Sequence, residues 1–334
     1  MEIAEFKEFI SQPRHIVITT HHKPDGDALG SSLGLTALLK SLGHEVVFIS
    51  PSDFPAFFDW MPGRAEIVIY TESTETANQL VAKADLICCL DFNHLKRINE
   101  LGEAVAASPA IKVMVDHHLD PQGFDDFRYW DTEASSTAEL IYRLAFELGL
   151  DKFISREVAT CLYTGIMTDT GSFRFPRTTP ALHRIVASLI EHGADNVAIH
   201  QLVYDQYTIS RLHFLGYCLN EKLVVIDELH TAYFAISASE LEQFTIQTGD
   251  TEGIVNYALA LAGIKLAVLM IERKDMIKLS FRSTGDFPCN LLAAKYFSGG
   301  GHKNASGGMS TDSLPDTLKK FTNALTEFRQ LLVI

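Results

Sequence analysis

The sequence lacks the cysteine patterns of disulfide-rich and zinc-finger proteins. Its 334 residues include only five cysteines, an odd number without a CxxC pair. Disulfide frameworks and structural zinc sites use cysteines in pairs at short spacings, so the sequence argues against both. We expect all five thiols to be buried and reduced. They are Cys88, Cys89, Cys161, Cys218 and Cys289.

Targeting and membrane segments are also missing. The first 13 residues, MEIAEFKEFISQP, carry acidic residues where a secretory signal carries basic ones, and they contain no apolar core. The most apolar stretch, residues 257–271, is interrupted by Lys265 and is shorter than the roughly 20 residues of a membrane span. We therefore expect a cytoplasmic protein without a membrane partner.

Positive charge is scarce. Lys and Arg number 28 against 42 Asp and Glu, which gives a formal net charge of -14. Proteins that follow long nucleic acids neutralise many phosphates with Lys and Arg, so we expect no binding to long duplex DNA. Residues 251–310 differ, with seven Lys or Arg against four Asp or Glu. Any nucleic-acid substrate would therefore be short. The positive balance of residues 251–310 is suited to binding an anion.

The hydrophobic pattern predicts an α/β protein of two domains, because 334 residues exceed what one core usually supports. Continuous apolar runs such as LICCL and IKVMV predict strands buried on both faces, hence a mainly parallel sheet with helices on both sides. The predicted strands are His15–Thr20, Glu45–Ser50, Ile67–Tyr70, Asp85–Asp91 and Ile111–Asp116, and the clearest helices are Ala28–Leu42, Ser135–Leu148 and Arg156–Met167.

A second, smaller α/β domain follows a helical linker. The pattern becomes helical and polar near residues 176–220, and apolar strands resume after it. The predicted strands of this part are Lys222–Ile226, Thr231–Ile236, Lys265–Ile271 and Met276–Phe281. The expected organisation is a catalytic domain over residues 1–190, a linker over 191–220 and a substrate-binding domain over 221–334.

Polar residues gather where the predicted strands of the first domain end. His21, Asp25 and Asp27 follow the first strand in THHKPDGDALGSS, and Asp91 ends LICCL. Ligands bind at the carboxyl ends of parallel strands, and carboxylates with imidazoles ligate divalent cations such as manganese. Taken alone, PDGD would fit a simple turn and Asp91 a loop cap.

Two further clusters carry the same chemistry. Asp116, His117 and His118 end the strand VMVDHH, and Asp169 lies in GIMTDTGSF at the end of a helical pattern. Histidine can bind metal, transfer protons or contact phosphate. Adjacent strand residues point to opposite faces, so both histidines reach one site only where the strand turns. Asp169 alone would fit a helix cap.

The ordered clusters HHKPDGD, LDFN, DHH and TDTGSF resemble the DHH phosphoesterase superfamily, which includes RecJ-type exonucleases and family II inorganic pyrophosphatases. Downstream, KLSFRS and FSGGGHKNASGG resemble the DHHA1 domain. Together with ASSTAEL and TEGIVNYAL, the resemblance spans residues 15–310 and is closest to the stand-alone bacterial oligoribonucleases and 3'-phosphoadenosine 5'-phosphate (pAp) phosphatases.

This resemblance implies two divalent metal ions, Mn²⁺ first, with Mg²⁺ or Co²⁺ as alternatives. It assigns His21, Asp25 and Asp169 to one ion, Asp27 and His117 to the other, and Asp91 to both. Among the catalytic residues with Asp91, His118 would contact the scissile phosphate and Asp116 would orient a histidine. His22 is expected not to be a ligand, and the role of Arg97 stays open.

The second domain would grip the substrate. Arg282 offers a planar fork for a terminal phosphate or a base edge, and glycines let backbone amides approach an anion. A glycine run alone is as often a flexible loop, and a lone arginine often forms a surface ion pair. The expected substrate-binding residues are Ser135, Ser136, Arg282, Gly299, Gly300, Gly301 and His302, with Thr137 as a further donor. The substrate would lie in a cleft between the domains.

The predicted activity is hydrolysis of short oligonucleotides, of pAp, or of both. The main alternative is cleavage of cyclic dinucleotides or their linear products. Hydrolysis of polyphosphate or pyrophosphate and non-catalytic nucleotide binding are less favoured, because the metal ligands are complete and a nucleotide grip is present. Cleavage polarity, the native metal and the oligomeric state, including a homodimer, are left open.

Overall fold

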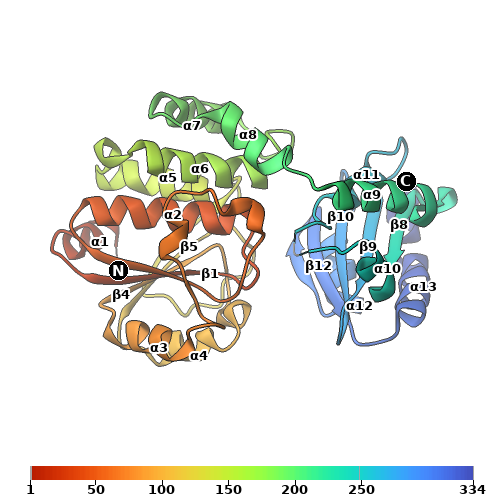
Figure 1. Ribbon diagram of the computed structural model, residues 1–334, viewed down its shortest axis with the longest axis horizontal. Coiled ribbons are helices and arrows are strands. Elements are labelled where there is room, and N and C mark those ends of the chain that lie inside the picture. Colours follow the sequence, from red (N-terminus) through yellow and green to blue (C-terminus); the bar gives the residue numbers. More distant parts are fainter. Residues whose placement is uncertain (1, 248, 334) are drawn as a thin grey trace. The chain divides into compact units, whose positions relative to one another are not determined.

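The computed structural model describes residues 2–247 and 249–333. The chain divides into two compact units, which we call unit 1, Met1–Gln206, and unit 2, Tyr207–Ile334 (Figure 1). Each unit has its own sheet and its own buried core. All five cysteines are free and buried. Over the described residues, no helix combines the length and the apolarity needed to cross a membrane.

Unit 1 is built on a parallel sheet of six strands in the order β3-β2-β1-β4-β5-β6. The strands are β1 (His15–Thr20), β2 (Glu45–Ser50), β3 (Val68–Ile69), β4 (Leu86–Leu90), β5 (Ile111–Asp116) and β6 (Phe127–Trp130). The predicted α/β fold with a parallel sheet is confirmed, and β6 was not predicted. The run LICCL is buried at every position, as a central strand requires.

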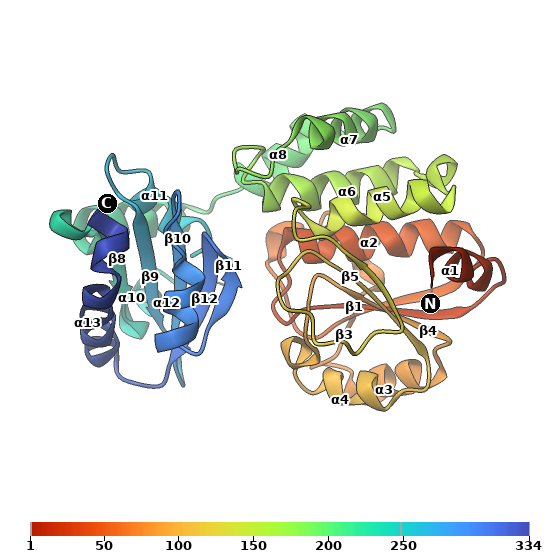
Figure 2. The same ribbon diagram turned by 180° about the vertical axis from the view of Figure 1, so that it is seen from behind.

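Helices cover both faces of this sheet (Figures 1 and 2). On one face lie α1 (Ile3–Phe9), α2 (Gly26–Ser41), α5 (Thr137–Leu148) and α6 (Arg156–Asp169). On the other lie α3 (Thr74–Lys83) and α4 (Leu101–Ala107). A further layer beyond α5 and α6 consists of α7 (Pro180–Glu191) and α8 (Asn196–Tyr204). Because β1, β4 and β5 are parallel neighbours, the connections that follow them emerge at the same edge of this covered sheet.

Glycines bring α2 and α6 into backbone contact. A Cβ added at Gly30 would lie 2.5 Å from the Cys161 carbonyl oxygen and 2.7 Å from the Gly165 nitrogen. One turn earlier, a Cβ at Gly26 would collide with the side chain of Thr168. Because the start of α2 is pressed against the end of α6, residues at these two ends are neighbours in space.

Unit 2 is built on a second, mixed sheet in the order β11-β12-β10-β9-β8-β7. The strands are β7 (Val224–Ile226), β8 (Thr231–Ile236), β9 (Leu266–Glu272), β10 (Ile277–Ser283), β11 (Gly300–His302) and β12 (Ala305–Ser310). The helices are α9 (Ile209–Tyr217), α10 (Ala238–Gln243), α11 (Ile254–Leu259), α12 (Cys289–Tyr296) and α13 (Leu314–Val333). Only β8 and β9 pair in parallel; the other pairs are antiparallel.

Alternate residues of β9 face two separate cores. Leu266 and Val268 pack in the core that includes residues of α12 and α13, whereas Ala267 and Leu269 pack in the core that includes residues of α9 and α11. This period of two is the signature of a strand covered on both sides. Unit 2 is therefore a sheet with a helical layer on each face.

The close approach of α2 and α6 yields a stability prediction. We expect Gly30→Ala to lower the free energy of unfolding by about 1–3 kcal/mol, because the added methyl group forces two backbones apart. Gly216, on α9, has no atom within 4 Å of an added Cβ. The matched variant Gly216→Ala should therefore keep or raise stability. Urea unfolding of both variants checks this, and equal stability of the Gly30 variant and the wild type would contradict the packing argument.

Candidate active site

The carboxyl ends of three neighbouring strands bring the predicted polar residues together. His21 follows β1, Asp91 follows β4, and β5 ends at Asp116. These strands are adjacent in the sheet, with β4 between the other two. The residues that the structure gathers here are His21, Asp25, Asp27, Asp91, Asp116, His117, His118 and Asp169.

Asp91 lies at the centre of this group. Its Oδ2 atom is 3.4 Å from Nε2 of His21, and its Oδ1 atom is 3.5 Å from Nε2 of His117. The hydroxyl of Thr137 donates a hydrogen bond to Oδ1 at 3.0 Å. The residue is 2% exposed and has a φ of +63°, a conformation that aspartate tolerates better than most residues. One fixed carboxylate thus faces His21 with one oxygen, and His117 and His118 with the other.

The ligand atoms form two groups of three side chains, and Asp91 belongs to one of them. The ligand atoms of His21, Asp25 and Asp91 lie within 4.8 Å of one another, as do those of Asp27, His117 and Asp169. The Asp169 Oδ2 atom is 3.6 Å from Nε2 of His117. The family resemblance predicts that Asp169 shares an ion with His21 and Asp25. The structure groups it with Asp27, because α6 ends beside the start of α2.

Both central histidines are oriented by backbone carbonyls. Nδ1 of His21 lies 3.0 Å from the His22 oxygen, and Nδ1 of His117 lies 3.4 Å from the Ala134 oxygen. A neutral ring that donates from Nδ1 presents the Nε2 lone pair on its other side. In both rings that atom faces carboxylate oxygens. This is the second contact that metal-binding histidines commonly make.

The Asp27 carboxylate is held by the N-terminus of α5. The backbone N–H groups of Thr137 and Ala138 donate to its two oxygens at 2.6 and 2.9 Å. A helix N-terminus favours negative charge, and here the anion is a side chain of the protein itself. Thr137 was predicted as a further donor to the substrate, and its backbone N–H is already used by Asp27.

The serines before α5 have structural contacts as well. Ser136 is fully buried, and its hydroxyl accepts the N–H of Glu139 at 3.0 Å as the N-cap of α5. The backbone N–H of Ser135 donates to the Glu139 carboxylate at 2.8 Å, and its side chain is buried. The predicted substrate contact of Ser136 stays a prediction, and in this structure the residue is fully buried, with its hydroxyl used by the N-cap. Ser135 is nearly as inaccessible.

Asp116 was predicted to orient a histidine, and in the structure it contacts His118. The Asp116 Oδ1 atom lies 2.7 Å from Nδ1 of His118, and Asp116 is fully buried. Burial lowers the pKa of His118 despite the opposing effect of the Asp116 hydrogen bond, and the charge of Arg97 lowers it further. Its lowered pKa favours the neutral form of His118, and a ring that donates from Nδ1 to Asp116 leaves Nε2 as an acceptor.

The centre of the site carries an excess of buried negative charge. Burial, with repulsion from Asp91 and Asp169, raises the pKa of Asp27 well above its ordinary value. For His117, burial would lower the pKa, but the hydrogen bond to Asp91 and the nearby carboxylates raise it to about 10. For Asp91, burial would raise the pKa, but hydrogen bonds from His117 and His21 hold it well below its usual range. Such a cluster of buried carboxylates attracts cations.

In unit 2, the glycines predicted to bind an anion form a β-hairpin. β11 pairs with β12, and a Cβ at Gly299 would collide with the backbone of Gly307. Gly301 has a φ of +135° and lies against the Ala305 carbonyl. Both glycines are thus required by close strand packing and not by a flexible loop, whereas Gly300 has open space around it.

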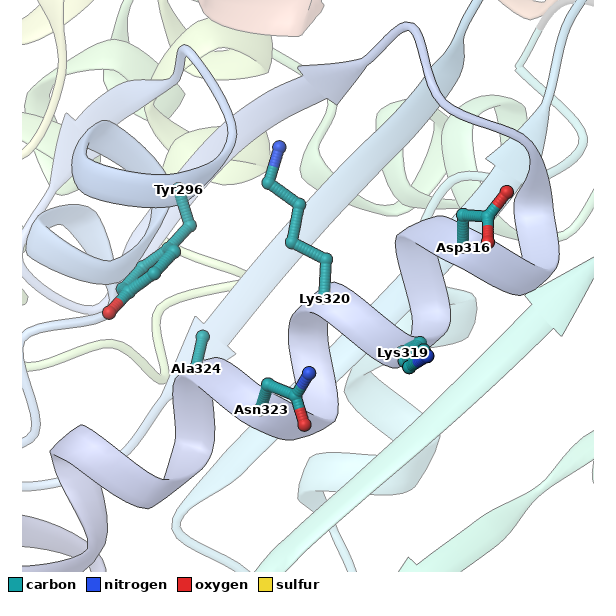
Figure 3. Close-up of a pocket in the computed structure, with 6 residues that line it drawn as sticks. All are labelled: Tyr296, Asp316, Lys319, Lys320, Asn323 and Ala324. Carbon is teal, nitrogen blue, oxygen red and sulfur yellow. The ribbon is translucent and has the colours of Figure 1, made fainter.

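Arg282 lies on β10, with Ala267 and Ala305 as its neighbours on the adjoining strands. Its Nη1 group donates to the Phe281 oxygen at 3.0 Å. A depression of about 370 Å³ lies elsewhere in unit 2, between α12 and α13 (Figure 3). It is lined by Tyr296, Asp316, Lys319, Lys320, Asn323 and Ala324, none of which was predicted as a site residue.

Comparisons with known proteins identify relatives of both units of the chain. The pattern of the DHH family, N-terminal domain, matches residues 15–166, and that of the DHHA1 domain matches residues 230–332. The bifunctional oligoribonuclease and PAP phosphatase NrnA of Thermus thermophilus is 31% identical over 91% of this chain and 86% of its own length. The protein of the same name from Bacillus subtilis is 29% identical over 87% of this chain and 88% of its own length.

A solved structure matches nearly the whole chain. The crystal structure of an exopolyphosphatase-related protein from Bacteroides fragilis is 42% identical, superposes with a TM-score of 0.94, and covers 99% of this chain and 97% of its own. Both the motifs and the fold are therefore shared with known proteins. The chain belongs to the DHH family of phosphoesterases and carries a DHHA1 domain in its C-terminal part, as its motifs predicted.

Proposed function

We propose that this phosphoesterase cleaves short oligonucleotides, removes a phosphate from pAp, or does both, using two divalent metal ions. Mn²⁺ is the preferred choice, with Mg²⁺ or Co²⁺ as alternatives. The observation that carries the proposal is the position of Asp91, whose two oxygens face His21 and His117 separately. Relatives that are 27–31% identical over most of the chain are named as oligoribonucleases and PAP phosphatases.

The residues present fit such ions. Nε2 lone pairs and carboxylate oxygens face one another at 3.4–3.6 Å around Asp91 and His117, an arrangement of acceptors that favours a shared cation. Nitrogen with oxygen ligands suits manganese and its neighbours among the transition metals. The second contacts of both histidines orient them for this purpose.

We assign each ion its own ligands and one that is shared. His21 and Asp25 would hold the first ion, and Asp27, His117 and Asp169 the second, with Asp91 between them. When bound, two such ions lower the pKa of a water and offset negative charge on the phosphoryl oxygens. His118, whose tautomer Asp116 fixes, would exchange a proton with the reacting ester through Nε2.

Unit 2 would bind the rest of the substrate. Arg282 carries a guanidinium suited to a terminal phosphate, and the open space around Gly300, with His302 on the same edge strand, suits a ligand backbone. We propose residues 1–190 as the catalytic part, 191–220 as the linker and 221–334 as the substrate-binding part. The net charge of -14 favours short substrates over long duplexes. We also propose that the enzyme is cytoplasmic.

The proposed function is tested by a manganese-dependent assay on four substrates at matched concentration. These are a 5'-phosphorylated RNA dinucleotide, pAp, cyclic di-AMP and pyrophosphate. We expect the dinucleotide or pAp to be preferred, and Asp91→Asn to abolish turnover by weakening both metal sites. Preference for cyclic di-AMP would make this a signalling enzyme. Inactivity on all four substrates, or normal turnover by the Asp91 variant, would overturn the proposal.

Substitution of Arg282 should weaken substrate binding without changing the chemical step. We expect Arg282→Ala to raise KM for the dinucleotide by about tenfold or more, because a charge-assisted bidentate contact is lost. Hydrolysis of bis-p-nitrophenyl phosphate, which lacks a terminal phosphate, should change little. Steady-state kinetics on both esters check this, and equal losses on the two would remove Arg282 from substrate binding.

Metal removal should give an unusual pH dependence of stability. The pKa of His117 is raised to about 10, so its stabilising contribution is complete below pH 6.5 and is lost as pH rises towards 10. Ionisation of Asp27, whose pKa is raised, acts in the same direction. The chelated protein should therefore melt at lower temperature as pH rises from 6.5 to 10. Added Mn²⁺ should remove the decline, since metal replaces the lost protons.

Thermal unfolding in chelator, with and without Mn²⁺, measures this dependence. His117→Gln serves as the control, because a side chain that does not titrate should flatten the slope of the chelated protein. A chelated wild type that becomes more stable between pH 6.5 and 10 would contradict the electrostatic description of the site.

A further inference from the structure

One more charged side chain is held beside the site by the loop after β4. Arg97 lies on the 3₁₀ turn Leu95–Ile98. Its backbone oxygen accepts the N–H of His22 at 2.7 Å, which ties this turn to the segment that follows β1. The main chain of Arg97 is thereby fixed next to His21.

The turn is also fixed from its other side. The N–H of Leu95 donates to the Gln122 side chain at 3.0 Å, and the N–H of Gln122 donates to the Asn93 oxygen at 2.8 Å. The Asn93 side chain donates in turn to the Leu119 oxygen at 2.5 Å. The loops after β4 and β5 are therefore bound together, and Arg97 projects from a rigid backbone of the kind that precise ligand contacts require.

The charge of Arg97 acts on two histidines of the site. It opposes the carboxylates that raise the pKa of His21, and it adds to the burial that lowers the pKa of His118. The Arg97 charge is thus unfavourable to protonation of both rings. A positive group in this place attracts an anion that binds between or beside these residues.

Arg97 also lacks the carboxylate partner that three arginines of unit 1 have. Arg64, Arg128 and Arg143 each contact an aspartate at 2.7 to 2.9 Å. Over residues 2–247 and 249–333, no carboxylate lies within 4.0 Å of the Arg97 guanidinium, although the side chain is half-buried. A half-buried charge without a counter-ion is costly, and a bound anion offsets that cost.

We infer that Arg97 binds the scissile phosphate in the active site. The inference rests on the proposed function and adds a residue to it. A guanidinium presents two parallel N–H groups that match two phosphate oxygens. The position beside His21 and His118, at the ends of β1 and β5, selects the reacting phosphate and not the remote end of the substrate. The positive charge stabilises the negative charge that develops on this group during cleavage.

The experiment compares Arg97→Ala and Arg97→Lys with Lys96→Ala, an exposed neighbour on the same turn. Kinetics with Mn²⁺ are measured on the RNA dinucleotide and on bis-p-nitrophenyl phosphate, together with Mn²⁺ affinity and binding of inorganic phosphate. We expect Arg97→Ala to lose about 100-fold in kcat/KM on both esters and to bind phosphate more weakly, with unchanged Mn²⁺ affinity. Arg97→Lys should recover part of the loss, and Lys96→Ala should behave as wild type.

Three results would overturn the inference while leaving the proposed function intact. They are near-normal kinetics of Arg97→Ala on both esters, a loss confined to the dinucleotide, and a loss of Mn²⁺ affinity in both Arg97 variants. Inactivity of the wild type on both esters and also on pAp would instead overturn the proposed function. If Arg97→Ala does not fold, Arg97→Lys decides, because a lysine that contacts phosphate at one point keeps the charge but loses the bidentate contact.

Discussion

Two backbone N–H groups at the start of α5 hold the Asp27 carboxylate at 2.6 and 2.9 Å, and the remainder of the site depends on this contact. Asp27 belongs to the first turn of α2, and a Cβ added at Gly165 of α6 would lie 3.0 Å from its Oδ1 atom. Three helices therefore meet at one buried carboxylate. A shift of any of them would change the distance between Asp27 and the histidine and aspartates beside it.

The same buried carboxylates lower the stability of the fold and create the binding site for cations. Buried carboxylates are unfavourable unless they are paired, and here Asp27, Asp91 and Asp116 are almost completely buried within one small volume. Backbone amides offset part of this cost at Asp27, histidines offset part at Asp91, and His118 does so at Asp116. The remaining negative charge is what divalent cations would neutralise. The α/β sheet can support this because its buried strands hold the loops rigidly at one edge.

Much of this molecule was predictable from local sequence. Runs such as LICCL and IKVMV have the apolar continuity of central parallel strands, and they form β4 and most of β5. Because the polar clusters follow those strands, their meeting at one sheet edge was predictable too. The hairpin of β11 and β12 was not predicted, since its glycines have no side chains to give an alternating pattern.

The finer structure of the site depends on contacts between distant segments. The placement of Asp169 beside Asp27 follows from the register in which the glycines of α2 meet α6, and no local pattern carries that register. The use of the Thr137 and Ala138 amides by Asp27 is equally non-local, because these partners are 110 and 111 residues apart. The contact that holds Arg97 to His22 is of the same kind.

The central claim is that Asp91 joins two metal sites. Electron paramagnetic resonance of the protein titrated with Mn²⁺ tests it most directly, because two Mn²⁺ ions bridged by one carboxylate are magnetically coupled. The account predicts two ions per chain with a coupled spectrum at full occupancy, and loss of the coupling in Asp91→Asn. A single Mn²⁺ per chain, or two ions with uncoupled spectra, would contradict it.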